Sequence, residues 1–219
     1  MCYLETELAK NDNLLAKTDV TATGYYVDGN RFLRVSNVCN RVYPFRLAPR
    51  TDEIRRQWDA ARDNGTFAHS CISAWLTGTG AAVAETAIST SVFAQLNAFL
   101  ETFSVRWVVV ALERTIYSSN DNVYKIAGTF DALFYDTEKN EFVLVDWKYT
   151  PYMAHFKQEK HALQLNIYAM ILETMYNIPV SRAYIVQFHE SLCDGLPRVW
   201  PHTLAHLDYA SLNELIDSH

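Results

Sequence analysis

Asp131 and Asp146 each interrupt an apolar run within residues 128–150, and Lys148 follows the second acid by two positions. Burial of two carboxylates side by side is unfavourable unless a cation holds them together. Carboxylate oxygens and a backbone carbonyl are ligands that suit a hard divalent ion such as Mg²⁺. The pattern therefore predicts a metal platform, with the Lys148 ammonium group beside the position where an attacking water must form. The alternative is a buried Asp–Lys ion pair, since Asp-x-Lys alone is a weak motif.

The elements that carry these three residues are predicted to be strands. Residues 105–117, 123–136 and 141–149 are rich in β-branched and aromatic residues, with turn signals between them, which indicates a three-stranded antiparallel meander. Counted outward from the turn around residues 136–140, the two aspartates lie near one another on adjacent strands. Lys148, two residues beyond the second aspartate, points to the same face of its strand.

Helices are predicted on either side of the meander in the sequence. Thr51 caps a helix that Gly65 ends, and Thr66 caps a second, short helix that Gly78 stops. The other predicted elements are a hairpin at 24–35 with its turn at 28–30, helices at 81–102 and 158–177, strands at 183–189 and 198–204, and a short terminal helix. Together they predict an α/β fold, in which a mixed central sheet is flanked by helices on both faces.

Four further residues are candidates for the same site. Glu113 ends the strand before the hairpin and can reach the same edge, either as a second-metal ligand or water orienter or as an ordinary strand-end acid. Gln164 and Tyr168 share one face of the following helix, and against an apolar sheet they need polar partners. The metal-site carboxylate, the lysine or a bound phosphate can supply those partners. His69, expected in the first turn of its helix, has the weakest support from spacing, since a lone histidine is usually a core or surface residue.

The net charge of −6 argues against a nucleic-acid partner, but its distribution argues for one. Residues 31–62 hold eight arginines against three acids, which makes this segment +5 and leaves −11 for the rest of the chain. Guanidinium groups suit bidentate contacts with phosphates. We therefore expect Arg55, Arg56 and Arg62, on one side of the predicted helix, to contact a nucleic-acid strand. The alternative is a solvated helix face with ion pairs.

The composition excludes several classes of protein. A hydrophobic content of 49% and an aromatic content of 13% exclude a disordered chain. No apolar run approaches the length of a membrane span, and the first residues are too polar for a signal peptide, so a soluble, intracellular protein with no membrane partner is expected. The four cysteines are scattered without a Cys-x-x-Cys pair, which is poor spacing for zinc and typical of reduced thiols.

Three motifs occur in a characteristic order. Gly128-Thr129-Phe130-Asp131, Asp146-Trp147-Lys148 and Gln164-x-x-x-Tyr168 resemble the GxxD, (D/E)xK and QxxxY motifs of the RecB-like branch of the PD-(D/E)XK nucleases. Phe130 stands where the superfamily has its proline, a replacement that is common in this branch.

Two upstream segments extend the resemblance to roughly residues 24–210. Residues 65–69, Gly-Thr-Phe-Ala-His, look like the branch's G-x-x-x-H helix start, whose histidine binds metal. Residues 34–38, followed by 43–45, are similar to an N-terminal segment of exonucleases from phages, large DNA viruses and mitochondria.

The resemblance implies a PD-(D/E)XK restriction-endonuclease-like core with one or two Mg²⁺ or Mn²⁺ ions. It implies that Lys148 positions and activates water, that Glu113 is a second-site acid, and that Gln164 and Tyr168 contact the scissile phosphate or brace the lysine. The implied metal ligands are His69, Asp131, Asp146 and the Trp147 carbonyl, and the implied nucleic-acid contacts in the N-terminal segment are Arg34 and Ser36. An iron–sulfur cluster is not expected, because only Cys193 lies downstream of these motifs.

The expected function is hydrolysis of DNA phosphodiester bonds by a metal-dependent exonuclease that acts on ends or single strands. The alternatives are an endonuclease of the same superfamily, with RNA as a further substrate, and an inert nucleic-acid-binding module of the same fold. A single nuclease domain is expected over residues 1–219. In it, residues 24–104 are mainly helical and contact DNA, and residues 105–210 form the catalytic sheet and the QxxxY helix.

Overall fold

The computed structural model of the 219-residue chain describes residues 19–21, 24–27, 30–44, 51–103, 106–118, 124–192 and 194–218. Its centre is an eight-stranded mixed sheet. The strands are β1 (Asp19–Thr21), β2 (Gly24–Val27), β3 (Asn30–Arg34), β4 (Trp107–Ser118), β5 (Ile126–Asp136), β6 (Glu141–Tyr149), β7 (Val180–Phe188) and β8 (Arg198–His202). The helices are α2 (Val35–Val42), α3 (Asp52–Leu76), α4 (Ala87–Phe103), α5 (His155–Tyr176) and α6 (Tyr209–Asp217), with a short 3₁₀ turn η1 (Gly80–Ala82).

Strand β5 organises the sheet. One of its edges pairs with β4 along almost the whole strand, and both β4–β5 and β5–β6 are antiparallel, so the predicted meander is confirmed. Its other edge is divided between two partners. Residues 132–136 pair with β6, whereas Ile126 and Ala127 pair in parallel with β3. Between these two pairings lies a gap of four residues, 128–131, which contains the glycine and the aspartate of the first motif.

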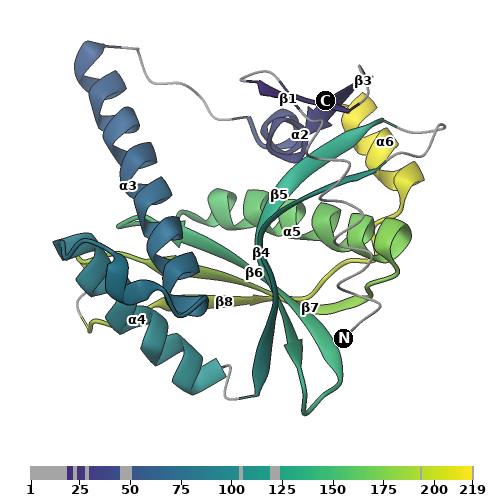
Figure 1. The fold of residues 1–219 in the computed structure, drawn as a ribbon. Helices are drawn as coiled ribbons and strands as arrows, with labels where there is room; N and C mark the ends of the chain where they lie inside the picture. The colour runs from purple at the N-terminus through teal and green to yellow at the C-terminus, as the bar shows by residue number, and fades with distance from the viewer. Residues whose placement is uncertain are drawn as a thin grey trace.

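Helices cover both faces of the sheet, as predicted (Figure 1). Helices α2, α5 and α6 pack on one face, in a core that includes Val38, Ile167 and Ile216. Helices α3 and α4 pack on the other face, in a core that includes Ile72 and Phe99. The site described below therefore has helices above and below it, and one histidine from each layer can approach the sheet.

Several predicted helix boundaries are confirmed. The Thr51 hydroxyl accepts a hydrogen bond from the Ile54 amide at 3.3 Å and caps α3. Asn177, which ends α5, takes the left-handed conformation with a φ of 53°, a geometry that asparagine tolerates better than most residues. The predicted hairpin at 24–35 is present as β2 and β3, although residues 28 and 29 of its turn lie outside the described residues.

The predicted break at Gly65 and Thr66 is wrong, because α3 continues through both residues to Leu76. The Thr66 hydroxyl is not a cap but donates to the Arg62 carbonyl one turn earlier, at 3.1 Å. His69 therefore lies well inside a long helix, not in the first turn of a short one. The burial of Ala68 and Ile72 against α4 and the sheet offsets the weak helix propensity of glycine.

The helix predicted at 81–102, in contrast, begins later than expected. Its first residues form the 3₁₀ turn, and α4 begins at Ala87. Thr86 and Ser89 exchange hydrogen bonds at this start, since the Ser89 amide donates to the Thr86 hydroxyl at 3.1 Å and the Thr86 amide donates to the Ser89 hydroxyl at 2.8 Å. Within the described part of the chain, no helix is long and apolar enough to cross a bilayer.

Two glycine-to-alanine substitutions should change stability in opposite directions. Gly65 lies in mid-helix with open space around it, so Gly65→Ala should stabilise the protein by about 0.5–1 kcal/mol. At Gly128 an added Cβ would lie 2.8 Å from Tyr168 Cε1 and 2.9 Å from Val35 Cγ2, so Gly128→Ala should destabilise it by about 1–3 kcal/mol. Urea unfolding measures both values. Equal stability of the two variants would contradict this packing.

Candidate metal and nuclease site

The site forms where strands β5 and β6 separate. Their ladder runs from the turn as far as Ala132 and Val145, and the next residues along the two strands are Asp131 and Asp146. Beyond this point the Asp131 carboxylate replaces the lost backbone partner, because its Oδ2 accepts the Trp147 N–H at 2.7 Å. The aspartate thus holds the two strands in register after their backbones have stopped pairing.

The alternation of side chains along β5 changes at the same position. Phe130 packs in the core beneath α5, whereas Ala132 packs in the opposite core beneath α3 and α4. Two residues apart on a regular strand, these side chains would share a face. The interruption at Asp131 allows groups from both helix layers to reach one place, as His69 of α3 and His161 of α5 do.

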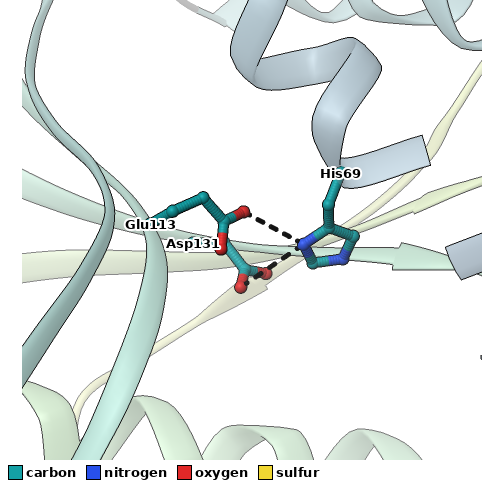
Figure 2. Close-up of side chains that lie close together, drawn as sticks. All are labelled: His69, Glu113 and Asp131. Atoms are coloured by element: carbon teal, nitrogen blue, oxygen red, sulfur yellow. Dashed lines mark hydrogen bonds and ion pairs between the residues drawn. The ribbon is translucent and has the colours of Figure 1, made fainter. Parts of the chain in front are cut away.

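His69, Glu113 and Asp131 form one cluster (Figure 2). The His69 Nδ1 atom lies 3.2 Å from Glu113 Oε1 and 3.7 Å from Asp131 Oδ1. The other ring nitrogen, Nε2, lies 3.0 Å from the Trp147 carbonyl oxygen. In the tautomer that carries its proton on Nε2, His69 donates to that carbonyl and turns the Nδ1 lone pair toward the two acids. A second hydrogen bond of this kind is what commonly orients a metal-binding histidine.

Glu113 reaches the cluster through an unusual backbone conformation. Its φ is +47°, in the middle of strand β4, whereas the other described non-glycine residues with positive φ are the asparagines 140 and 177. A glutamate in this region is strained by about 1–2 kcal/mol. The turn of the backbone directs the Glu113 carboxylate toward His69, so this strain is located at the candidate site.

Asp146 and Lys148 form the second half of the site. Lys148 Nζ donates to Asp146 Oδ1 at 2.7 Å, and the Asp146 side chain is only 3% exposed. Its other oxygen, Oδ2, is buried and has no hydrogen-bond partner among the described residues, and the same holds for Nδ1 of His161, 3.8 Å away. A buried carboxylate oxygen without a partner is unfavourable, and a bound cation or an ordered water resolves it.

The electrostatics of the cluster favour a bound cation. Burial, with a further contribution from the Asp146 carboxylate, raises the pKa of Asp131 to about 7 against the opposing effect of His69. Burial disfavours the charged forms of His69 and Lys148, but the neighbouring carboxylates outweigh it and raise the pKa of both groups. The carboxylates therefore favour the positively charged forms of His69 and Lys148. A bound divalent ion would balance the same negative charge.

The donor set fits a hard divalent metal. His69, Glu113 and Asp131 each offer one ligand atom, and these three atoms all lie within 4.8 Å of one another. Two carboxylates and one imidazole suit Mg²⁺ or Mn²⁺ better than a thiophilic ion. Asp146 is outside this group of three, but it precedes Trp147, whose amide binds Asp131, and its unpartnered oxygen is a further candidate ligand.

The structure brings Gln164 and Tyr168 into the gap on β5. The Tyr168 hydroxyl donates to the Thr129 carbonyl at 2.8 Å, and Gln164 Nε2 donates to the Tyr168 hydroxyl oxygen at 3.2 Å. These contacts explain the glycine of the first motif, because a side chain at 128 would collide with the tyrosine ring. Burial raises the pKa of Tyr168 well above its ordinary value, so the hydroxyl remains a donor.

Arg34 and Ser36 lie beside this pair. Together with Gly128, Gln164 and Tyr168 they line a pocket of about 190 Å³. The Arg34 guanidinium lies over the Tyr25 ring, 5.5 Å from its centre, and this contact fixes its direction. Thr129 also lines this pocket, two residues before Asp131 on β5, so a pocket with a cation and hydroxyl groups adjoins the segment that carries Asp131.

The other three predicted arginines lie elsewhere. Arg55, Arg56 and Arg62 are exposed on the N-terminal part of α3, which extends away from the sheet (Figure 1). Each pairs with an acid of the same helix, at 3.9 Å with Asp52, 3.0 Å with Glu53 and 2.9 Å with Asp59, respectively. Along the helix axis, Arg55 precedes His69 by about 20 Å and Arg62 precedes it by about 10 Å. The acids that pair with these arginines belong to α3 and not to the cluster.

Three residues of α5 were missed in the sequence. His161 faces Asp146, and Lys157 and Lys160 line a pocket together with Lys148. With Gln164 and Tyr168 they recur at i, i+3, i+4, i+7 and i+11, which is one face of a helix. This spacing is a sequence signal that links the three residues to the Gln164–Tyr168 pair.

An α/β sheet that gathers acids, a lysine and a histidine where two strands separate is an arrangement suited to phosphodiester hydrolysis. The chain belongs to the PD-(D/E)XK nuclease superfamily, which residues 45–212 match. Among solved structures it is similar to an alkaline exonuclease from Laribacter hongkongensis, with 14% identity and a TM-score of 0.42 over 85% of this chain and 84% of the other. It is also similar to a protein named SSO0001, with 14% identity and a TM-score of 0.44 over 99% and 82% of the two chains. No curated protein matches the sequence.

Metal binding should depend on His69. Titration calorimetry with Mn²⁺ should show binding to the unmodified protein, and His69→Ala should weaken it by at least about tenfold. His206→Ala, which removes an exposed histidine outside the site, is the matched control and should bind Mn²⁺ normally. Unchanged Mn²⁺ affinity together with a lowered melting temperature in His69→Ala would reduce this residue to a structural role.

The strain at Glu113 should be measurable by comparing two variants. Glu113→Gly and Glu113→Gln both remove the carboxylate, but only glycine adopts a positive φ without steric conflict. Glu113→Gly should therefore be more stable than Glu113→Gln by about 1 kcal/mol in urea unfolding. If Glu113→Gln is the more stable variant, the left-handed conformation at this position carries no strain.

Proposed function

We propose that this protein is a metal-dependent DNA exonuclease of the RecB-like branch of its superfamily. One observation supports the proposal most strongly. Thr129, two residues before Asp131 on β5, lines a pocket that also contains Arg34, Ser36 and the Gln164–Tyr168 pair. One short segment of β5 thus connects a cluster suited to phosphodiester hydrolysis with a cationic pocket that can hold a neighbouring phosphate.

In this proposal His69, Glu113, Asp131 and Asp146 hold one or two Mg²⁺ or Mn²⁺ ions. The bound metal would supply Lewis-acid stabilisation of charge on the phosphate oxygens and would lower the pKa of a bound water. The protein contributes the arrangement of the ligands. Asp131 is held by the Trp147 amide at 2.7 Å, and His69 is held by the Trp147 carbonyl at 3.0 Å, so the backbone of a single residue orients two ligands.

Lys148 is proposed to orient the attacking water and to stabilise its developing negative charge. Its ammonium group is fixed by the 2.7 Å hydrogen bond to Asp146, which leaves two N–H donors for water and phosphate. The raised pKa of Lys148, which the carboxylates cause against the effect of burial, keeps it protonated and therefore an electrostatic stabiliser.

Gln164 and Tyr168 are proposed to brace the wall of the phosphate pocket. The Tyr168 hydroxyl is committed to the Thr129 carbonyl, two residues before Asp131, so it fixes the strand segment that carries the ligand. The Gln164 amide holds the tyrosine in turn. Arg34 and Ser36 then supply the cation and the hydroxyl that a terminal or neighbouring phosphate requires.

The preference for DNA ends or single strands is the most specific part of the proposal. Two other functions remain candidates: an endonuclease of the same superfamily with DNA or RNA as its substrate, and an inert nucleic-acid-binding module. The second requires the loss of a functional group, whereas this chain keeps the acids, the lysine and the glutamine–tyrosine pair.

Lys148→Ala and substrate topology together test this function. With Mg²⁺ or Mn²⁺, the unmodified protein should degrade linear single-stranded DNA and leave circular single-stranded DNA intact. Lys148→Ala should lower turnover by about 10³-fold while Mn²⁺ binding remains, because the lysine contacts the reacting water and not the metal. Lys139→Ala, an exposed lysine in the β5–β6 turn, is the control. Cleavage of circles would favour an endonuclease, and the absence of cleavage with every DNA and RNA would favour the inert module.

A further inference from the structure

A second pocket lies beside Lys148, and along α5 it is nearer the N-terminus of the helix than the Arg34 pocket. It has a volume of about 220 Å³ and is lined by Lys148, Lys157, Lys160 and His161, with Tyr43 and Phe156 among its aromatic residues. Lys157 and Lys160 come from the first turns of α5, and Tyr43 follows the end of α2, which packs along α5 (Figure 1). Among the described residues that line this pocket, none is acidic.

Three ammonium groups are held close together there. Burial is the largest cause of the lowered pKa of Lys160, and repulsion from Lys148 and Lys157 adds to it against the opposing effect of Cys39. The Asn40 side chain of α2 accepts a hydrogen bond from Lys160 and keeps its ammonium group at the pocket. Among the described acids, Glu159 is the nearest in sequence, and it lies 3.6 Å from His155. A cluster of like charges without acidic lining residues favours a bound anion.

The position of the pocket indicates which anion. Lys148 belongs both to this pocket and to the catalytic cluster, so a group bound here is adjacent to the scissile bond. Lys157 and Lys160 lie on the same stripe of α5 as Gln164 and Tyr168 in the Arg34 pocket. Lys157 precedes Gln164 by seven residues, which places the two pockets about 10 Å apart along the helix. A linear polyanion is long enough to occupy both pockets at once, whereas a small isolated anion can occupy only one of them.

Exposed aromatic residues border the lysines. Phe156, in the first turn of α5, lines the pocket and is 45% exposed, and Tyr152, in the segment between Lys148 and α5, is 71% exposed. Beside a cationic pocket, exposed aromatic rings are surfaces on which bases can stack. Aromatic side chains next to cationic ones match a single-stranded nucleic acid, whose bases are free to stack.

We propose that this second pocket is a phosphate subsite, in which Lys157 and Lys160 bind the phosphodiester next to the scissile one and Phe156 stacks on the adjoining base. The proposal rests on the nuclease function proposed above and adds the path of the strand. The substrate crosses the cluster along α5, from the Arg34 pocket on one side to the lysine pocket on the other. The arginines of α3 are not required for this path.

The first test is the salt dependence of binding. Anisotropy of an internally labelled 12-mer of single-stranded DNA is measured in EDTA, with a gel to show that the strand stays intact. Lys157→Ala/Lys160→Ala should weaken binding by about tenfold or more, and the slope of log affinity against log salt should fall by about 0.7 for each lost contact. Lys125→Ala/Lys139→Ala removes the same charge elsewhere and should leave the slope unchanged. A slope that is equal in all three proteins would overturn the subsite.

The second test locates the phosphate. Substrates carry one neutral methylphosphonate at the second linkage from the 5′ end or from the 3′ end. One of these two substrates should raise the KM of the unmodified protein by about tenfold. The same substrate should raise the KM of Lys157→Ala/Lys160→Ala by less than twofold, because that variant already lacks the contact between the lysines and this phosphate. Full additivity for both linkages would overturn the subsite even if cleavage is normal. If the unmodified protein cleaves no DNA or RNA, the proposed nuclease function fails. The salt slope, which is measured without cleavage, still shows whether Lys157 and Lys160 bind the strand, so the two failures can be told apart.

Discussion

The hydrogen bond from the Trp147 amide to Asp131 is the contact on which the rest of the site depends. Strands β5 and β6 stop pairing immediately before it, and without a partner the Trp147 N–H would be buried and unsatisfied. A carboxylate resolves this, but a carboxylate there is itself buried, and burial raises its pKa to about 7. His69 and Lys148 supply compensating positive charge, and a metal ion would complete it. The separation of the two strands thus leaves a buried carboxylate, and the candidate site residues His69 and Lys148 compensate its charge.

The gap on β5 also leaves backbone groups of residues 128–131 without a strand partner on that edge. Because β3 and β6 take the two ends of one edge, residues 128–131 have neither as a backbone partner, and the Tyr168 hydroxyl fills the vacant position at Thr129. The glycine, the aspartate and the tyrosine of the separate motifs are therefore parts of one structural solution. The proposed phosphate pocket and the proposed metal site are connected because this segment, which has no strand partner on that edge, contributes Gly128 and Thr129 to the pocket and Asp131 to the metal site.

Much of this arrangement could be predicted from the sequence. β-Branched and aromatic runs identified the meander, and the period of two placed Asp146 and Lys148 on one face. Local capping chemistry identified the ends at Thr51 and Asn177. The continuity of α3 could not be predicted locally, since Gly65 and Thr66 look like a boundary and only burial of the later residues against α4 overrides them. The positive φ of Glu113 is likewise a tertiary effect.

The number of charges and their positions point to different parts of the chain. Residues 31–62 hold eight arginines, but Arg55, Arg56 and Arg62 each have an acid three positions earlier, and those ion pairs are formed in the structure, so contact of these arginines with nucleic acid stays a prediction. Exposed ion pairs of this kind largely cancel the electrostatic field that would attract a distant strand. Lys157 and Lys160 are fewer, but they lie on the same face of α5 as Gln164 and Tyr168. Position relative to the catalytic residues, and not the number of charges, indicates where a strand can bind.

The most direct measurement of the central claim is anomalous diffraction from crystals soaked in Mn²⁺. The account predicts a manganese peak bounded by His69, Glu113, Asp131 and Asp146, and the loss of that peak in Asp131→Asn crystals whose β5–β6 junction is otherwise unchanged. A manganese site elsewhere on the molecule, or no site while Asp146 Oδ2 instead contacts an ordered water or His161, would contradict it. In that case the buried acids and Lys148 would be a structural ion-pair network.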